Sequence, residues 1–347
     1  MLNFPTLSRH SQKGFSLVEI MVGMIIGMLG IIIIMQVTSV FEARKRTTSS
    51  GDDAQNGGAI AIASMQRDID QAGYGLSSPQ LIGTSLLLAA SGARPALTLN
   101  PLTPVMLNPA QLNAQGDVGS NKILMIYGSS SNVEGSWITN STATLPYTIS
   151  LGAGTGGATD GGKGFNIGDW VIPSQSGVTG SVATPHSLYQ VNVAAASSVA
   201  VTGAPPALVY AANNAAVPLL FNLGSAPSLL AYAVINRSLV TCDYLNTDCS
   251  NAASWTQLAG DVYAMRAQCE STTGVRITLV TRNAQYDPTV VTTATPTWSP
   301  NGISTPVVAN PIVAWGADWN HYRYKTFESI IPIRNAIWAT GGVQGCS

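Results

Sequence analysis

The chain has 347 residues, of which 46% are hydrophobic and only 10% carry a formal charge. Its 16 basic and 17 acidic residues leave a net charge of −1, so the composition does not indicate the basic surface that nucleic-acid binding requires. The low charge, together with 34 glycines, favours an exported, β-rich protein over a cytosolic helical enzyme.

An apolar segment follows a short leader. No residue from Ile20 to Val40 carries a formal charge, and about 20 helical residues at about 1.5 Å each cross a hydrocarbon layer of about 30 Å. A secretory signal peptide fits poorly, because no small-x-small cleavage site follows the segment. A plain membrane anchor does not explain Glu19, because a carboxylate within a membrane segment costs about 2.5–3.5 kcal/mol.

The stretch "KGFSLVEIMVGMIIG", residues 13–27, resembles the class III signal of type IV pilins and type II secretion pseudopilins. In that family a prepilin peptidase cuts after the Gly that ends a basic leader and methylates the new N-terminus, and the fifth mature residue is Glu. The resemblance implies cleavage after Gly14, methylation of Phe15, and Glu19 at the fifth position. Glu19 would then pair with the α-amine of Phe15, its own or a neighbour's, because an acid and an amine in hydrocarbon are tolerated together and costly apart.

Two features of the span leave alternatives open. Gly23 and Gly27 form a G-x-x-x-G pattern, which is typical of close helix contacts in lipid but also of ordinary glycine use in membrane spans. Basic residues lie on both sides of the span, at Arg9 and Lys13 before it and at 44–46 after it, so the positive-inside rule does not fix the orientation. The resemblance implies an exported head.

The helix is predicted to continue beyond the membrane as an amphipathic segment. Its apolar stripe is expected to pack on the head and comprises Ile62, Met65 or Gln66, Ile69 and Ala72. The charged residues predicted to lie off this stripe are Arg67, Asp68 and Asp70. A fray or kink is predicted at three glycines, Gly51, Gly57 and Gly58. Gly73 and Gly75 are expected to end the helix.

The remainder is predicted to form strands and loops. Four short runs have strand character: 122–130, 169–174, 188–195 and 275–283. Segments 84–120 and 284–311 lack a clear period and are expected to be long surface excursions. The predicted organisation is a leader (1–14), a transmembrane helix (15–41), an amphipathic continuation (42–73) and a β-rich head (74–347). The predicted fold class is α+β, with a long N-terminal helix packed on a large antiparallel head, as in type IV pilins.

The C-terminal part is similar to the closing pattern of PilW-type minor pilins. The similar stretches are "DVYAMRAQ" (261–268), "VRITLVTRN" (275–283) and "YRYKTFESIIPIRNAIW" (322–338). A plain edge strand also explains the last stretch, since Tyr322 and Tyr324 alternate with basic residues. Arg334 and Asn335 would then be polar residues at the end of a strand.

Motifs for cofactors are weak. The loop "LGAGTGGATDGGKGFNIGDW" matches phosphate-binding patterns at Gly152, Gly154, Gly157, Gly162 and Lys163. Both patterns need a helix N-terminus after the loop, whereas a strand-like stretch follows, so a flexible loop and no cofactor are expected.

No metal motif appears either. His186 and His321 are far apart in sequence, and a solvated loop is favoured over weak calcium binding by Asp243 and Asp248.

Four cysteines lie in the last third of the chain: Cys242, Cys249, Cys269 and Cys346. On the far side of a membrane anchor an even count suggests disulfides, and three pairings are possible. We favour Cys242–Cys249 and Cys269–Cys346, which chain-entropy arguments value at roughly 2.5 and roughly 4.5 kcal/mol. The alternative is that one pair stays reduced.

The resemblance implies a structural protein rather than an enzyme. A PilW-like minor pilin would wait in the inner membrane with its head in the periplasm. It would then join a tip or priming complex of the type IV pilus, with roles in twitching motility and adhesion. Its partners would be the prepilin peptidase, other minor pilins, the major pilin and the inner-membrane assembly platform. The alternatives are a J-like type II secretion pseudopilin and an adhesin or enzyme that a pilin-like start delivers.

Overall fold

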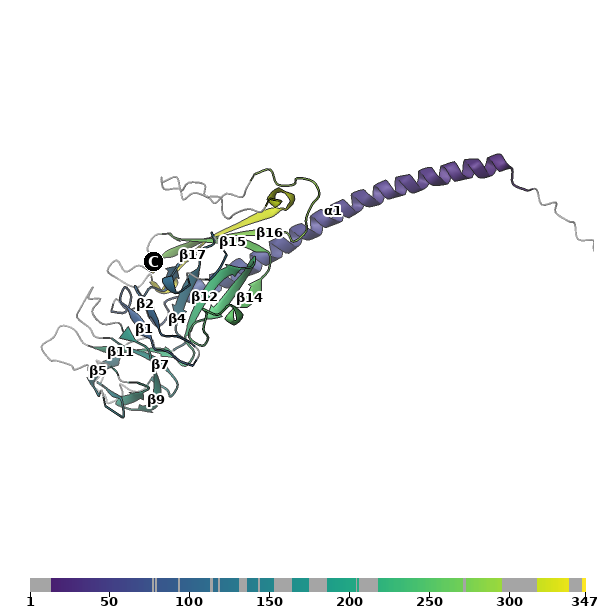
Figure 1. Cartoon of the computed structure of the whole chain (residues 1–347). Helices are drawn as coiled ribbons and strands as arrows, with labels where there is room; N and C mark the ends of the chain where they lie inside the picture. Colours follow the sequence, from purple (N-terminus) through teal and green to yellow (C-terminus); the bar gives the residue numbers. More distant parts are fainter. Residues whose placement is uncertain are drawn as a thin grey trace, which may run out of the picture. The chain divides into compact units, whose positions relative to one another are not determined.

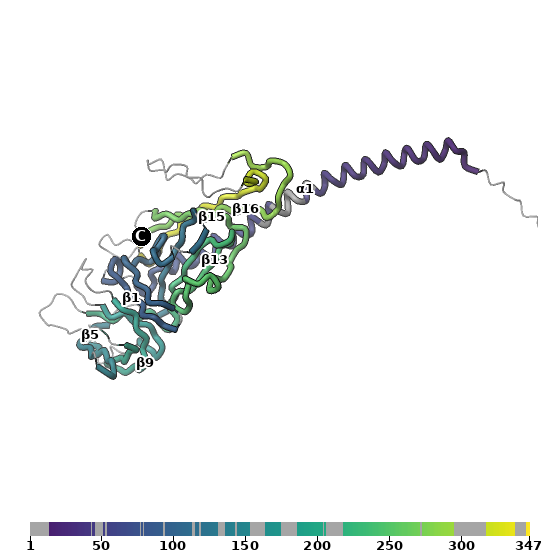
Figure 2. The backbone as a smooth tube through the Cα atoms, viewed as in Figure 1, coloured from purple at the N-terminus to yellow at the C-terminus, as the bar shows by residue number. Residues whose placement is uncertain are grey.

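The computed structural model describes most of the chain (Figures 1 and 2). The described residues are 14–76, 78, 80–92, 94–112, 115–117, 119–130, 136–142, 144–152, 164–174, 186–203, 205, 218–270, 273–294, 317–336 and 345–347. The chain forms two compact units, Met1–Asp52 and Asp53–Ser347. The second unit is called the head below.

One long helix, α1, runs from Leu17 to Gln71, so the predicted helix is confirmed to within two residues at each end. It is continuous through Gly51, Gly57 and Gly58, and the predicted fray does not occur. Gly57 and Gly58 instead allow close packing, which is described below. The helix ends as predicted, because Gly73 and Gly75 adopt φ of +81° and +80°, which L side chains rarely adopt.

The predicted stripe of α1 packs between two antiparallel sheets. The five-stranded sheet comprises β3 (Val105–Leu107), β4 (Ile123–Tyr127), β12 (Ser228–Ile235), β13 (Ser238–Asp243) and β14 (Thr256–Ala259), in the order β14-β13-β12-β4-β3. The three-stranded sheet comprises β15 (Val262–Glu270), β16 (Gly274–Arg282) and β17 (Tyr324–Pro332), in that order. Met65 and Ile69 are fully buried in this core.

A second core lies on the other face of the five-stranded sheet. In β4, Ile123 and Met125 face α1, whereas Leu124 and Ile126 belong to this second core. A small sheet covers it, with strands β1 (Leu86–Leu88), β2 (Leu97–Leu99) and β8 (His186–Ser187) in the order β2-β1-β8. Segment 84–120 is therefore not a surface excursion as predicted, because four leucines of β1 and β2 are buried: Leu86, Leu88, Leu97 and Leu99.

Six strands close into an antiparallel barrel in the order β10-β6-β5-β11-β7-β9. They are β5 (Ser136–Ser141), β6 (Thr148–Leu151), β7 (Trp170–Ser174), β9 (Tyr189–Ala195), β10 (Ser198–Val201) and β11 (Leu219–Gly224). The barrel has its own apolar core, which includes Ile138, Val171 and Leu220. Because β4 pairs directly with β12, from Tyr127 opposite Ser228, the barrel is an insertion into a hairpin of the five-stranded sheet.

The structure confirms the predicted α+β class, with a long helix followed by a largely antiparallel, β-rich head. The four strand predictions correspond to β4, β7, β9 and β16, and the tail contains β17. Short 3-10 turns are η1 (Ala110–Leu112), η2 (Ala252–Ser254), η3 (Trp319–His321) and η4 (Arg334–Ala336). Of the second predicted excursion, 284–294 packs on residues that precede β17, and 295–311 lies outside the described residues.

Candidate functional site

The predicted processing site lies just before α1. Gly14, Phe15 and Ser16 are outside the helix, and the Phe15 side chain is 80% exposed. The Gly14–Phe15 peptide bond is therefore accessible to a peptidase. The leader residues 1–13 lie outside the described residues.

Glu19 lies in the first turn of α1 and is exposed. The backbone N–H groups of Glu19 and Ile20 donate to the carbonyl of Ser16 at 3.0 and 3.2 Å, which places Ser16 at the start of the helix. An acidic side chain is favourable here, because the helix N-terminus carries a partial positive charge. A free α-amine at Phe15 would add a full positive charge only four residues before Glu19.

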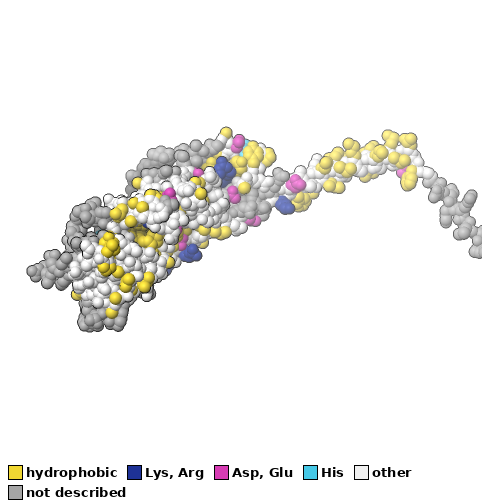
Figure 3. Space-filling view, turned by 60° about the horizontal axis from the view of Figure 1, so that its bottom comes forward, with side chains coloured by type: hydrophobic (Ala, Val, Ile, Leu, Met, Phe, Trp, Pro, Cys, Tyr) yellow, Lys and Arg dark blue, Asp and Glu magenta, His cyan; other side chains and the backbone are white. Residues whose placement is uncertain are grey.

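The helix surface from Leu17 to Glu42 has no partner within the described residues. This stretch has 26 residues and a mean hydropathy of 2.7, and none of its most apolar window is buried. Hydrophobic side chains cover it (Figure 3). At about 1.5 Å per residue it is long enough to span a bilayer, so its apolar side chains require lipid or other chains around them.

Comparison with known families shows what kind of segment this is. Residues 9–35 match the family described as the prokaryotic N-terminal methylation motif. The chain has a prepilin-like N-terminus. The matched residues contain Gly14, Phe15 and Glu19 together with the first half of the span. No curated protein and no solved structure matches the chain.

The prepilin-like motif implies processing by a prepilin peptidase and assembly with pilins. The apolar helix that follows it is consistent with anchoring in the inner membrane before assembly. The motif covers the apolar end of α1, and the head carries the other end.

The head holds its part of α1 through three contacts, which we call the helix clamp: Gly58 with Phe327, Asp68 with Tyr232, and the end of α1 with Asn335. At the first contact, a Cβ on Gly58 would lie 2.2 Å from the Phe327 ring. Next to it, a Cβ on Gly57 would lie 3.0 Å from the carbonyl of Gly260. The two glycines therefore form a notch that admits the ring and the turn between β14 and β15.

The second contact is a buried polar pair. Asp68 is 5% exposed and Tyr232 is 2% exposed, and the tyrosine hydroxyl donates to the carboxylate. Burial, followed by this hydrogen bond, raises the pKa of the Tyr232 hydroxyl above its usual range. The prediction that Asp68 lies off the packed stripe is wrong, because sheets pack on two sides of α1 and bury a wider arc than one stripe.

The third contact caps α1. The side-chain amide of Asn335 donates to the carbonyls of Gln71 and Ala72, both at 3.1 Å, and lies 3.4 Å from that of Asp70. Arg334 lies 3.5 Å from the Asp70 carboxylate. Both residues follow the end of β17, as the edge-strand interpretation expects. In addition, Asn335 satisfies carbonyls at the end of α1.

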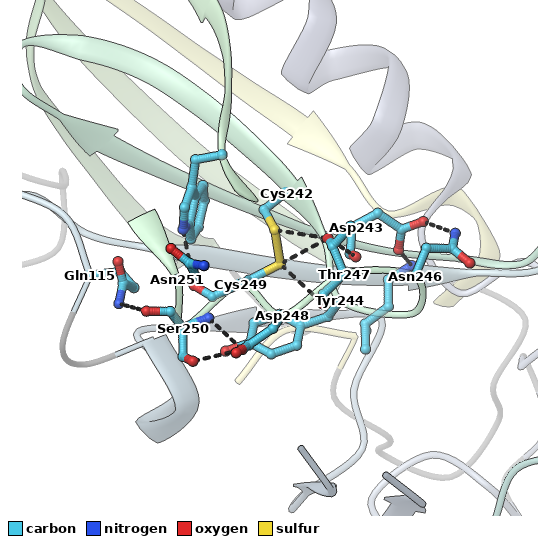
Figure 4. Close-up of a disulfide and its surroundings, with 12 residues drawn as sticks. Gln115, Cys242, Asp243, Tyr244, Asn246, Thr247, Asp248, Cys249, Ser250 and Asn251 are labelled. Carbon is cyan, nitrogen blue, oxygen red and sulfur yellow. Dashed lines mark hydrogen bonds between the residues drawn. A yellow bond between two sulfur atoms is a disulfide. The ribbon is translucent and has the colours of Figure 1, made fainter. Parts of the chain in front are cut away.

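The cysteines form two disulfides, which are the pairs that the sequence analysis favours. Cys242–Cys249 closes a short loop after β13 (Figure 4). Asp243 accepts from the N–H of Leu245 at 3.0 Å, and Asp248 accepts from that of Ser250 at 3.0 Å. Both carboxylates thus stabilise the loop itself.

Cys269–Cys346 joins the two sheets that enclose α1. Cys269 belongs to β15, and Cys346 bridges in parallel to Val105 of β3. Ser347 donates to Val105 at 3.1 Å and accepts from the N–H of Leu107 at 2.6 Å. The C-terminal residues therefore cover the free edge of β3, and the disulfide holds them there.

Most of the loop with the phosphate-binding patterns lies outside the described residues. Only Gly152 of the glycine-rich loop motif is described, because 153–163 lies outside. His186 is in β8 and His321 is in η3, so the two belong to different elements. Within the described ranges no group of three or more His, Cys, Asp or Glu side chains is placed to hold a metal ion.

Proposed function

We propose that the chain is a PilW-type minor pilin that takes part in the initiation of type IV pilus assembly, in a tip or priming complex. The observation that carries this proposal is the methylation motif in register with Glu19, at the start of an apolar helix that the head leaves exposed. A structural subunit needs no catalytic step, and we propose that the head has none.

The size of the head supports a place at the tip. A six-stranded barrel is inserted between β4 and β12, in addition to the two sheets that enclose α1. Such a head would collide with its neighbours along a helical shaft, whereas the end of a fibre leaves room for it. The proposed partners are other minor pilins, the major pilin and the inner-membrane assembly platform.

Glu19 is proposed to act during assembly. Cleavage frees the amine of Phe15, and a carboxylate in hydrocarbon is costly unless it meets such a cation. Glu19→Ala should therefore reduce the number of pili without changing the amount of the protein. Glu42→Ala, at the other end of the same span, is the matched control and should assemble normally. Wild-type pilus numbers in the Glu19→Ala strain would contradict the proposal.

Two further measurements separate the alternatives. Mass spectrometry of the mature protein should give N-methyl-Phe15 as its first residue. Deletion of the gene should abolish pili and twitching. If exoprotein secretion is lost while pili remain, the chain is instead a type II secretion pseudopilin. If pili lacking only this head assemble normally but lose adhesion or an enzymatic activity, the head is a delivered module.

A further inference from the structure

We propose that one surface of the head rests on the lipid headgroups before the subunit is assembled. This surface, which we call the entry lobe, consists of residues 284–294 and 317–323. The contact uses aromatic and apolar side chains rather than net charge. It rests on the proposed anchoring of Leu17–Glu42 in a bilayer, but not on which machine the subunit joins.

The entry lobe lies where α1 enters the head. The Lys325 amine donates to the side-chain carbonyl of Gln55 at 2.6 Å, which places the start of β17 beside the first turns of α1 within the head. From there β17 runs along the helix, and Asn335 reaches the carbonyls at its end. The lobe directly precedes β17 and lies at its start (Figure 1). It therefore marks the end of the head from which the chain leads to the span.

The connecting chain limits how far the head can lie from the proposed span. Only residues 43–52 separate Glu42, the last residue of the span, from the head, which begins at Asp53. About ten residues reach at most about 35 Å even when fully extended. In α1 these ten residues are helical and rise about 15 Å. A head that the span retains at the bilayer can use a contact too weak to bind a free head.

The exposed side chains of the lobe suit a membrane interface. Tyr286 is 46% exposed and Val290 is 55% exposed. The Tyr286 ring stacks on His321, with centroids 4.8 Å apart, and meets the Tyr322 ring edge-on at 5.7 Å. Tyrosine is favoured at the headgroup level, because its ring is apolar and its hydroxyl is polar.

Backbone bonds hold the lobe in one shape. Asp287 donates its N–H to the carbonyl of His321 at 2.9 Å. Val291 and Thr292 both donate to the carbonyl of Asn320, at 2.9 and 3.0 Å. Arg323 pairs with the Asp287 carboxylate at 3.2 Å. A surface that is already ordered loses little conformational entropy when it binds.

The charges of the lobe set the expected lipid dependence. Its formally charged residues are Arg323, Asp287 and Asp318, which give a net charge of −1. Binding through anionic lipids requires an excess of cations. The contact is therefore expected on neutral lipid, and anionic lipid should not strengthen it.

The test uses the full-length chain in nanodiscs of phosphatidylcholine, with one copy per disc. Val290→Cys introduces a single free thiol for a fluorescent dye, because all four native cysteines are in disulfides. The matched control carries the dye at Leu145→Cys, a residue that is 79% exposed between β5 and β6 of the barrel. A headgroup-linked quencher should reduce the fluorescence of the dye at 290 several-fold more than that of the dye at 145.

Two variations define the contact further. Tyr286→Ser should weaken the quenching at 290, and replacing half of the lipid by phosphatidylglycerol should leave it unchanged. Equal quenching at 290 and 145 in inserted protein would refute the docking alone. If quenching at 290 requires phosphatidylglycerol, the contact does not depend on aromatic and apolar side chains, and that part of the proposal is refuted. A chain that does not enter the discs would refute the docking together with the anchoring on which the proposed function depends.

Discussion

The closest approach between α1 and the head gives a sharp test of the packing. Replacing Gly58 by Ala places a methyl group 2.2 Å from the Phe327 ring, which is far inside van der Waals contact. Ala gains about 1 kcal/mol over Gly in a helix, whereas overpacking costs about 1–3 kcal/mol. Because the contact is so short, we expect the upper part of that range and a net loss of about 1–2 kcal/mol.

The assay is equilibrium unfolding of the full chain in detergent by urea, followed by circular dichroism. Gly51→Ala is the control, because nothing lies within 4 Å of its Cβ, and it should leave stability unchanged or raise it by up to about 1 kcal/mol. Phe327→Ala should remove most of the difference between Gly and Ala at position 58, which a double-mutant cycle measures. If Gly58→Ala is as stable as the wild type, the notch does not exist as described.

Three other residues of the head lead to testable predictions. Tyr232→Phe leaves the Asp68 carboxylate buried without this donor and should cost about 1–3 kcal/mol in the same unfolding assay. Asn335→Ala removes the cap on α1 and should cost about 0.5–1.5 kcal/mol, with faster amide exchange at residues 73–75. Burial lowers the pKa of His186, so the folded state favours the neutral ring. The free energy of unfolding should therefore fall as the pH drops from about 6.5 towards the folded-state pKa. His186→Gln should remove that part of the pH dependence, as measured by thermal melts.

The sequence predicts the helix better than it predicts how the helix is buried. The 3.6-residue period identifies Ile69 as buried and leaves Met65 or Gln66 for the position before it, where the structure buries Met65. It misses Asp68, because the partner that makes burial of this carboxylate possible is Tyr232, in a distant strand. Periodicity assigns a polar residue to solvent unless its partner is known.

Local sequence patterns do not predict the small sheet or the closure of the barrel. The strands β1 and β2 have three residues each, which is too short for an alternating pattern to stand out, although the leucines at both ends of each strand are buried. The sequence indicates β7 and β9 as strands but not that six strands close a barrel. Closure depends on long-range pairs such as β5 with β11, and no local signal specifies them.

The two halves of α1 differ in burial: the first half is exposed, whereas the helix clamp fixes the second half in the head. From Leu17 to Glu42 none of the most apolar window of the helix is buried. The head therefore depends on contacts beyond Asp53. The ring in the Gly58 notch, the Asp68–Tyr232 bond and the Asn335 cap act at successive levels of the helix. A pull along the axis must break all three contacts together, because each fixes the same axial register.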